Sequence, residues 1–207
     1  MMKNSESREK NCWDYSTPGI PEEKFVQGDL PLTKREVRTI SISRLRLKTD
    51  HVVYDIGAGT GTVSIEIARQ SHKGKIFAVE KEKAGIDLIR KNADKFAVSN
   101  IEIIRGEAPQ ALKDLPQCDR IFIGGSGGRL TEILAVAVDK LRPGGIMVIN
   151  AITINTLTEA WQGLKEIGMD VEVTQLAAAR SRKIGDYDML KSLNPVFIIT
   201  GEGEEIQ

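Results

Sequence analysis

The sequence predicts an α/β fold with a doubly wound, mostly parallel sheet of seven strands and an antiparallel strand at its C-terminal edge. Short apolar runs rich in β-branched residues alternate with segments of helical periodicity from residue 51 to residue 167. Beyond them, two more apolar runs follow each other with no helical pattern between them. Strands joined without a crossover helix pair antiparallel, so we expect the second part of this region at the edge of the sheet.

The expected elements follow one another in a regular order. Thr33 and Glu36 fit an S/T-x-x-E capping box that begins a helix ending near Leu45. The core strands are expected at 51–56, 75–80, 101–105, 120–124 and 145–150, and the helices between them at 60–71, 83–97, 107–114 and 129–141. A helix at 154–167, a strand at 170–179, a polar loop with Arg180, Arg182 and Tyr187, and a last strand at 195–201 complete the chain.

The chain divides into three parts. Residues 1–32 are an N-terminal extension rich in proline, glycine and charge, and we expect its start to be flexible and its later part to pack over the domain. The α/β domain covers 33–201, and 202–207 form a C-terminal tail.

The composition is that of a globular protein without a nucleic-acid or membrane partner. Lys plus Arg number 29 and Asp plus Glu number 29, whereas a general polyanion binder usually has a basic excess. The polar start lacks the apolar core of a signal peptide, and no later segment approaches the length of a membrane span. Cys12 and Cys118 form no CxxC pair and two histidines add no zinc-ligand spacing, so we expect no metal, reduced thiols and a cytoplasmic location.

The motif "DIGAGTG", residues 55–61, lies at the first strand-to-helix turn, where open α/β sheets bind ligands. A dinucleotide-binding pattern would require glycine at Thr62, and no Gly-Lys-Ser/Thr of a P-loop follows. Asp55 would repel a pyrophosphate but attract a sulfonium and an ammonium. The turn therefore favours S-adenosylmethionine, with Gly57, Ala58, Gly59, Thr60 and Gly61 close to it.

The next two strands end in residues that suit the same cofactor. Glu80 can accept two hydrogen bonds from a ribose diol, with Lys81 beside it. Glu107 and Ala108, after the third strand, lie where an adenine edge would be read. A glycine turn alone can serve only packing, and a strand-end glutamate is often merely solvated. Their order at consecutive strand ends favours the cofactor site.

The fourth strand ends in "IGGSGG", residues 123–128, without an amide, an aromatic or a carboxylate. This stretch is either an open floor for a large flat substrate, made by Gly124, Gly125 and Ser126, or a flexible loop. Methyl transfer from a sulfonium is an in-line displacement, so positioning can supply most of the acceleration for a nucleophilic carbon. No catalytic base stands out, and the catalytic residues stay unassigned.

These motifs together resemble known families. The cofactor motifs resemble the class I, Rossmann-like S-adenosylmethionine-dependent methyltransferases over roughly 50–201. "GIPEEKFVQGDLPLTKREVR" (19–38), "FIGGSGG" (122–128) and "SLNPVFIITG" (192–201) together resemble the decarboxylating cobalt-precorrin-6B methyltransferases of cobalamin synthesis. The chain departs from that family at Leu32, where methionine is common, and in the loop at 179–190.

The resemblance implies methylation of carbon-15 of a corrin precursor, loss of carbon dioxide from its ring C acetate, and a homotetramer. It implies that Thr33 contacts the cofactor. Arg180 and Arg182 would bind substrate carboxylates, because arginine binds them bidentately, with Tyr187 beside them, although such a charge run is more often simply solvated. An RNA or protein methyltransferase on the same fold, or a non-catalytic S-adenosylmethionine-binding domain, are the alternatives. Whether the substrate already contains cobalt is left open.

Overall fold

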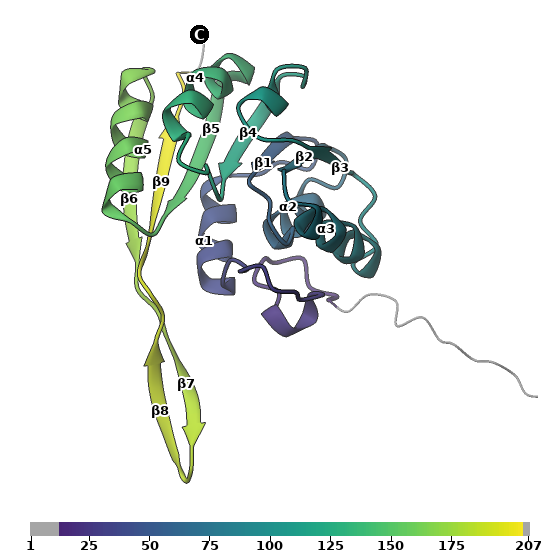
Figure 1. Cartoon of the computed structure of the whole chain (residues 1–207), viewed down its shortest axis with the longest axis vertical. Helices are drawn as coiled ribbons and strands as arrows, with labels where there is room; N and C mark the ends of the chain where they lie inside the picture. Colours follow the sequence, from purple (N-terminus) through teal and green to yellow (C-terminus); the bar gives the residue numbers. More distant parts are fainter. Residues whose placement is uncertain (1–12, 205–207) are drawn as a thin grey trace, which may run out of the picture.

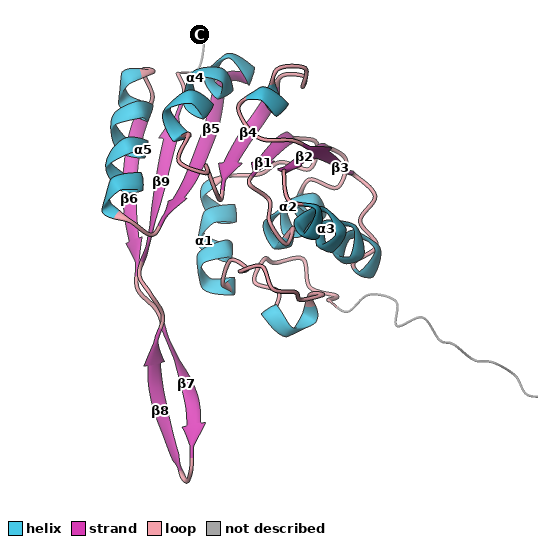
Figure 2. Ribbon diagram, in the orientation of Figure 1, coloured by secondary structure: helices cyan, strands magenta, loops and turns pink. Residues whose placement is uncertain are grey.

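Seven strands form one mixed sheet in the order β3-β2-β1-β4-β5-β9-β6 in the computed structural model, which describes residues 13–204 (Figures 1 and 2). The strands are β1 Val52–Ile56, β2 Lys75–Glu80, β3 Ile101–Arg105, β4 Cys118–Ile123, β5 Leu141–Ala151, β6 Asp170–Leu176 and β9 Val196–Glu202. β1 to β5 pair in parallel, and β9 runs antiparallel to both neighbours. The expected fold class is confirmed, but β9 lies one position inside the edge, which β6 occupies.

Helices cover both faces of this sheet (Figure 2). α1 Arg35–Arg44, α2 Thr62–Gln70 and α3 Lys83–Lys95 lie on one side, and α4 Leu130–Lys140 and α5 Ile154–Glu166 on the other. Alternate strand residues serve the two layers, since Val53 packs in the core with α1 and α2 whereas Tyr54 packs with α4 and α5. The double covering explains why the central strands are almost continuously apolar.

The prediction of a helix at 107–114 is wrong. Only a 3-10 turn, η2 (Gln110–Leu112), forms there. Pro109 and Pro116 bound the segment, and a proline can neither donate to a helix nor let the preceding residues continue it easily, so a single turn remains.

The prediction of a polar loop at 179–190 is also wrong, because a two-stranded hairpin forms in its place. β7 (Ala179–Ile184) pairs antiparallel with β8 (Tyr187–Ser192) through the two-residue turn Gly185–Asp186, where Gly185 has φ +60°. The hairpin extends away from the sheet beyond β6 and β9 (Figure 1). The Gly-Asp pair between two strand-like runs was the sequence signal for it.

Three expectations concern residues outside 13–204: the flexible start of the N-terminal extension, the thiol of Cys12 and the last residues, 205–207, of the C-terminal tail. Within 13–204, none of the helices is long and apolar enough to cross a bilayer.

Residues 19–34, here called the strap, pack across α2 and α3 before α1 begins, as expected for the later part of the extension (Figure 1). The strap contains a short 3-10 helix, η1 (Glu22–Lys24). Its start is held by Glu66 of α2, whose carboxylate accepts hydrogen bonds from the Gly19 and Ile20 N–H groups at 2.8 and 2.9 Å.

A buried ion pair anchors both ends of the strap. Arg38 of α1 is fully buried and donates from Nε to Oε1 of Glu66 at 2.7 Å. Its other nitrogens donate to the backbone oxygens of Ile20 and Thr33. Because the guanidinium bonds to Ile20 near the start of the strap and to Thr33 near its end, it fixes the distance between these two ends.

The capping box expected at Thr33 is wrong. α1 begins at Arg35, its N-cap residue is Lys34, and the cap residue makes no side-chain hydrogen bond to the helix. The Arg35 N–H instead donates to Oε1 of Glu22 at 2.9 Å. A carboxylate from the strap therefore caps the helix, and no local spacing rule reveals that contact.

We expect Glu66→Ala to lower the free energy of unfolding by about 3–5 kcal/mol, because it leaves the Arg38 guanidinium buried without its counter-ion. Urea unfolding followed by circular dichroism measures this loss. Arg46→Ala, which breaks the exposed pair with Glu202, is the matched control and should cost only about 0–1 kcal/mol. Equal losses in the two variants would contradict the role given to the buried pair.

Candidate functional site

The site lies where the order of the strands reverses, between β1 and β4. Gly57, after β1, has φ +71°, and a Cβ there would lie 2.4 Å from the backbone oxygen of Gly125, after β4. The Gly124 N–H donates to the Ile56 oxygen at 3.0 Å. Only glycine at position 57 lets these two loops approach so closely, and ligands bind at such crossings in open α/β sheets.

Glu80, at the end of β2, is buried and holds the glycine turn. Its Oε2 accepts from the Gly59 N–H at 2.7 Å, and its Oε1 accepts from the Glu82 N–H at 2.8 Å. Each carboxylate oxygen retains a second lone pair. The side chain therefore lies in a fixed orientation and can still accept hydrogen bonds from a ligand.

Asp55 has a buried oxygen without a hydrogen-bond partner. Its side chain is 0% exposed, and the Ser64 hydroxyl donates to Oδ2, whereas Oδ1 has no protein partner. Burial raises the pKa of Asp55 to about 7, against the hydrogen bond from Ser64, which lowers it. An orphaned carboxylate oxygen at the wall of a cavity is a suitable acceptor for a cationic ligand group.

Two cavities meet at these residues. The glycine-turn cavity has a volume of about 450 Å³ and extends from Glu80 past Asp55 to Asn150 and the end of the strap. Among its lining residues are the sequence-predicted Thr33, Asp55, Gly57, Ala58, Gly59, Thr60 and Glu80. The Ala108 cavity, about 210 Å³, lies on the other side of Gly57 and Glu80. Ile56, Val79, Ala108 and Ile133 give it an apolar wall, and Gly61 lines neither cavity.

Charged side chains border the Ala108 cavity. Lys81 and Glu107, both predicted site residues, form an ion pair at 2.9 Å, and Arg129 lies 3.7 Å from the same glutamate. The hydrogen bond from Lys81 lowers the pKa of Glu107 and raises that of Lys81. The side chains of Lys81 and Glu107 are about half exposed, so they can move with a ligand.

The predicted floor residues lie between the cavities. Gly124 lines the glycine-turn cavity, and Gly125 and Ser126 line the Ala108 cavity. All three also line a smaller hollow of about 130 Å³ with Asn150 and Ile152 at the end of β5. Oδ1 of Asn150 accepts from the Ser41 hydroxyl at 2.9 Å, so the amide is held by α1.

Arg180, Arg182 and Tyr187 line none of these cavities. Arg180 donates to Glu36 at 2.7 Å and to Glu22 at 2.7 and 3.1 Å. These bonds lower the pKa of Glu36 to about 2, and lower that of Glu22 to about 2 although burial acts against them. The Arg180 guanidinium thus has its counter-ions within the chain, while Arg182 and Tyr187 lie on the projecting hairpin.

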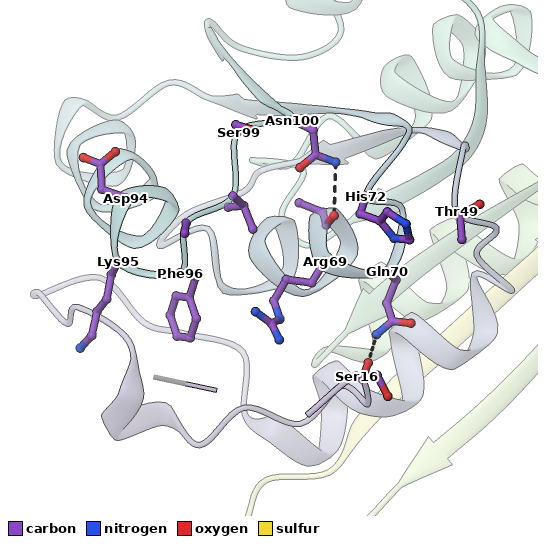
Figure 3. Close-up of a pocket in the computed structure, with 13 residues that line it drawn as sticks. Ser16, Thr49, Arg69, Gln70, His72, Asp94, Lys95, Phe96, Ser99 and Asn100 are labelled. Atoms are coloured by element: carbon purple, nitrogen blue, oxygen red, sulfur yellow. Dashed lines mark hydrogen bonds between the residues drawn. The ribbon is translucent and has the colours of Figure 1, made fainter. Parts of the chain in front are cut away.

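A larger hollow, about 1000 Å³, lies elsewhere (Figure 3). Thr49 and Asn100 precede β1 and β3, so it lies at the amino ends of the strands. Two of its polar side chains already bond to the backbone, since Asn100 donates to Ala68 and Gln70 donates to Ser16 (Figure 3). Position and chemistry both favour the glycine-turn cavity as the functional site.

Several residues that line the glycine-turn cavity were not predicted as site residues, and Lys34, Asn150 and Ile152 are among them. Lys34 was only part of the motif at 19–38, and Asn150 was only the expected end of a strand. The rule that ligands bind at carboxyl ends of parallel strands applies to β5 as well, so it could have identified Asn150.

Comparisons with known proteins agree with this geometry. A family model described as "Precorrin methyltransferase domain" matches residues 24–201. A "Probable cobalt-precorrin-6B C(15)-methyltransferase (decarboxylating)" of Pyrobaculum calidifontis is 42% identical over 91% of this chain and 97% of its own. The cobalt-precorrin-6B C(15)-methyltransferase (decarboxylating) of Salmonella typhimurium is 38% identical over 90% and 97%. The crystal structure of precorrin-6y C5,15-methyltransferase from Geobacter metallireducens has a TM-score of 0.86 at 42% identity, covering 89% of this chain and 98% of that one.

We expect the stability of the ligand-free protein to fall, relative to that of Asp55→Asn, as the pH rises from about 4 to about 7. The folded carboxyl group has a pKa of about 7 against an ordinary 3.8, so the folded state binds the proton more tightly in this range. The difference in the free energy of unfolding should change by about 1.4 kcal/mol per pH unit. Urea unfolding at several pH values measures it.

Ser64→Ala provides the check on this assignment. Without the hydroxyl that favours the ionised carboxylate, the transition should move to higher pH. Parallel pH profiles for the wild type and Asp55→Asn would show that Asp55 does not titrate in this range.

Proposed function

Because the chain belongs to the precorrin methyltransferase family, we propose that it methylates carbon-15 of cobalt-precorrin-6B and removes carbon dioxide from the ring C acetate, in cobalamin biosynthesis. The observation that carries this proposal is the glycine-turn cavity, which joins a polar cofactor side to an acceptor side at the crossing of β1 and β4. Relatives named for this reaction match the chain over nearly their whole length, which supports the same reaction here.

The residues present fit S-adenosylmethionine, which supplies an electrophilic methyl group when bound. Orphaned Oδ1 of Asp55 suits the positive groups of the cofactor, and Glu80 suits its ribose diol. The apolar wall of the Ala108 cavity suits a planar adenine. Gly59 also lines the glycine-turn cavity, and a Cβ there would meet no atom closer than the Gly57 oxygen at 4.0 Å, so its missing side chain lets the cofactor lie against the backbone. Thr33, from the strap, closes this site on the side of α1.

On the acceptor side, the chain supplies positioning rather than acid–base chemistry. Gly124, Asn150 and Ile152 border the place where the cavity continues beyond the cofactor residues. None of them ionises in the physiological range. The strap limits the access of water, and the fixed loops after β1 and β4 hold the two reactants in one orientation, which is the main requirement for transfer to a nucleophilic carbon.

The alternatives have less support. An RNA methyltransferase usually carries a basic surface, but the chain has no net charge, and its arginine run is partly neutralised by Glu22 and Glu36. A non-catalytic cofactor-binding domain would not need the acceptor hollow that Gly124, Gly125 and Ser126 line.

We propose further that the protein forms a homo-oligomer, with four chains as the expected number, through the β7–β8 hairpin. Tyr187 is 75% exposed and Leu190 is 76% exposed, and Ile184 and Met189 are also exposed. The register places Leu190 on one face of the hairpin and the other three on the opposite face. A lone hairpin is marginally stable in water, and exposed apolar side chains on both of its faces suit burial against further copies of the chain.

Incubation of the protein with methyl-labelled S-adenosylmethionine and cobalt-precorrin-6B should transfer label to the tetrapyrrole and release carbon dioxide in equal amounts. Mass spectrometry of the product and collection of the gas measure the two events. Label found only in tRNA or protein, or none at all, would refute the proposal.

Glu80→Ala is the cofactor control for this assay. Without the carboxylate, the dissociation constant of S-adenosylhomocysteine, measured by calorimetry, should rise at least about tenfold, as expected for the loss of a charged hydrogen-bond acceptor. An unchanged constant would remove Glu80 from the site.

The oligomer is tested with the double variant Tyr187→Arg, Leu190→Arg. Charges on both faces of the hairpin should reduce the mass measured by light scattering to that of one chain. Ser99→Arg, far from the hairpin at the amino ends of the strands, is the control and should leave the mass unchanged. A monomeric wild type would refute the oligomer.

A further inference from the structure

Lys34 is a cation at the meeting point of two cavities. It lines the glycine-turn cavity, and it also lines a side cavity of about 200 Å³ beneath the base of the hairpin. It is exposed, and no carboxylate within 13–204 forms an ion pair with it. As the N-cap residue of α1, it also lies at the positive end of a helix dipole.

The carboxylates near Lys34 at the start of α1 are already paired with arginines. Glu22 and Glu36 are the carboxylates at the start of α1, and both are bound by Arg180. Arg35 adds a further contact to Glu36 at 3.4 Å. Two acids and two arginines therefore balance one another, and the charge of Lys34 is left facing the cavities.

The side cavity has the shape and chemistry of a receptor for a short acidic arm. Leu176, Leu193 and Val196 give it an apolar wall, and Lys34 and Asn194 are its polar members. Its volume equals that of roughly six or seven water molecules. An arm of one or two methylene groups ending in a carboxylate would place its stem on the apolar wall and its charge at Lys34.

The two ends of the glycine-turn cavity carry side chains of opposite charge. Asp55, Glu80 and Glu82 all lie toward the cofactor side, whereas Lys34 and Val196 line the end shared with the side cavity. An anionic group would thus be repelled from the cofactor end and attracted to the Lys34 end.

We propose that Lys34 binds a carboxylate on a short side arm of the methyl acceptor, and that the side cavity holds the stem of that arm. Lys34 therefore orients the acceptor, in place of Arg180, whose guanidinium is already paired. The inference rests on the proposed function, because it takes the acceptor to be a tetrapyrrole with carboxylated arms.

The test is steady-state kinetics with cobalt-precorrin-6B. Lys34→Met removes the charge and leaves an unbranched side chain one atom shorter, and it should raise the KM for the tetrapyrrole at least tenfold. The dissociation constant of S-adenosylhomocysteine should change less than twofold. Lys34→Arg should restore the KM to within threefold of the wild type, because it restores the charge.

Two further variants separate the site from general effects. Ala178→Phe fills the side cavity without altering charge, and it should also raise the KM at least fivefold. Lys48→Met removes an exposed lysine near the amino end of β1, and it should leave the KM unchanged. An unchanged KM in Lys34→Met, or an equal increase in Lys48→Met, would overturn the inference.

The outcomes distinguish this inference from the function itself. Wild-type turnover with an unaltered KM in Lys34→Met would refute the role of Lys34 and leave the function intact. If the wild type neither turns over cobalt-precorrin-6B nor binds it in an absorbance titration with S-adenosylhomocysteine present, the function and the inference are both refuted.

Discussion

The buried pair of Arg38 and Glu66 is the interaction that organises this molecule. Glu66 accepts from the first residues of the strap, and Arg38 donates to the backbone at both of its ends. Removing either partner would leave a charge and several backbone groups without partners inside the protein. The pair thus couples the N-terminal extension to α1 and α2, and through Thr33 it sets one wall of the glycine-turn cavity.

A second constraint is the near contact of the loops after β1 and β4. Because Gly57 and Gly125 meet through their backbones, the site has walls that side-chain motion cannot open. Polar groups then divide the cavity by charge, with acids toward the end of β2 and a lysine toward the hairpin. A cationic cofactor and an anionic acceptor can be sorted to opposite ends before any chemistry begins.

The strands could be predicted, and most of the predicted residues around the glycine turn could be placed at the cavities, because both follow from short-range rules. Apolar periodicity located β1 to β5, and carboxyl ends of neighbouring parallel strands necessarily meet, which brought Asp55, Glu80 and Ala108 together. Contacts between residues distant in sequence could not be predicted. Thr33 fits a capping box, yet Glu22 caps α1, and Arg180 is bound by the same glutamate. The sequence alone does not distinguish an arginine that is paired within the chain, such as Arg180, from one that is free to bind a substrate.

Asn92 of α3 connects the strap with the glycine turn. Its amide exchanges hydrogen bonds with the backbone of Val26 in the strap and donates to the oxygen of Thr60 at 3.0 Å. Detachment of the strap would therefore free one side of the turn that lines the glycine-turn cavity. Local unfolding of the strap and release of the cofactor become linked equilibria, so the occupancy of the site also sets how often the N-terminal region opens to solvent and to proteases.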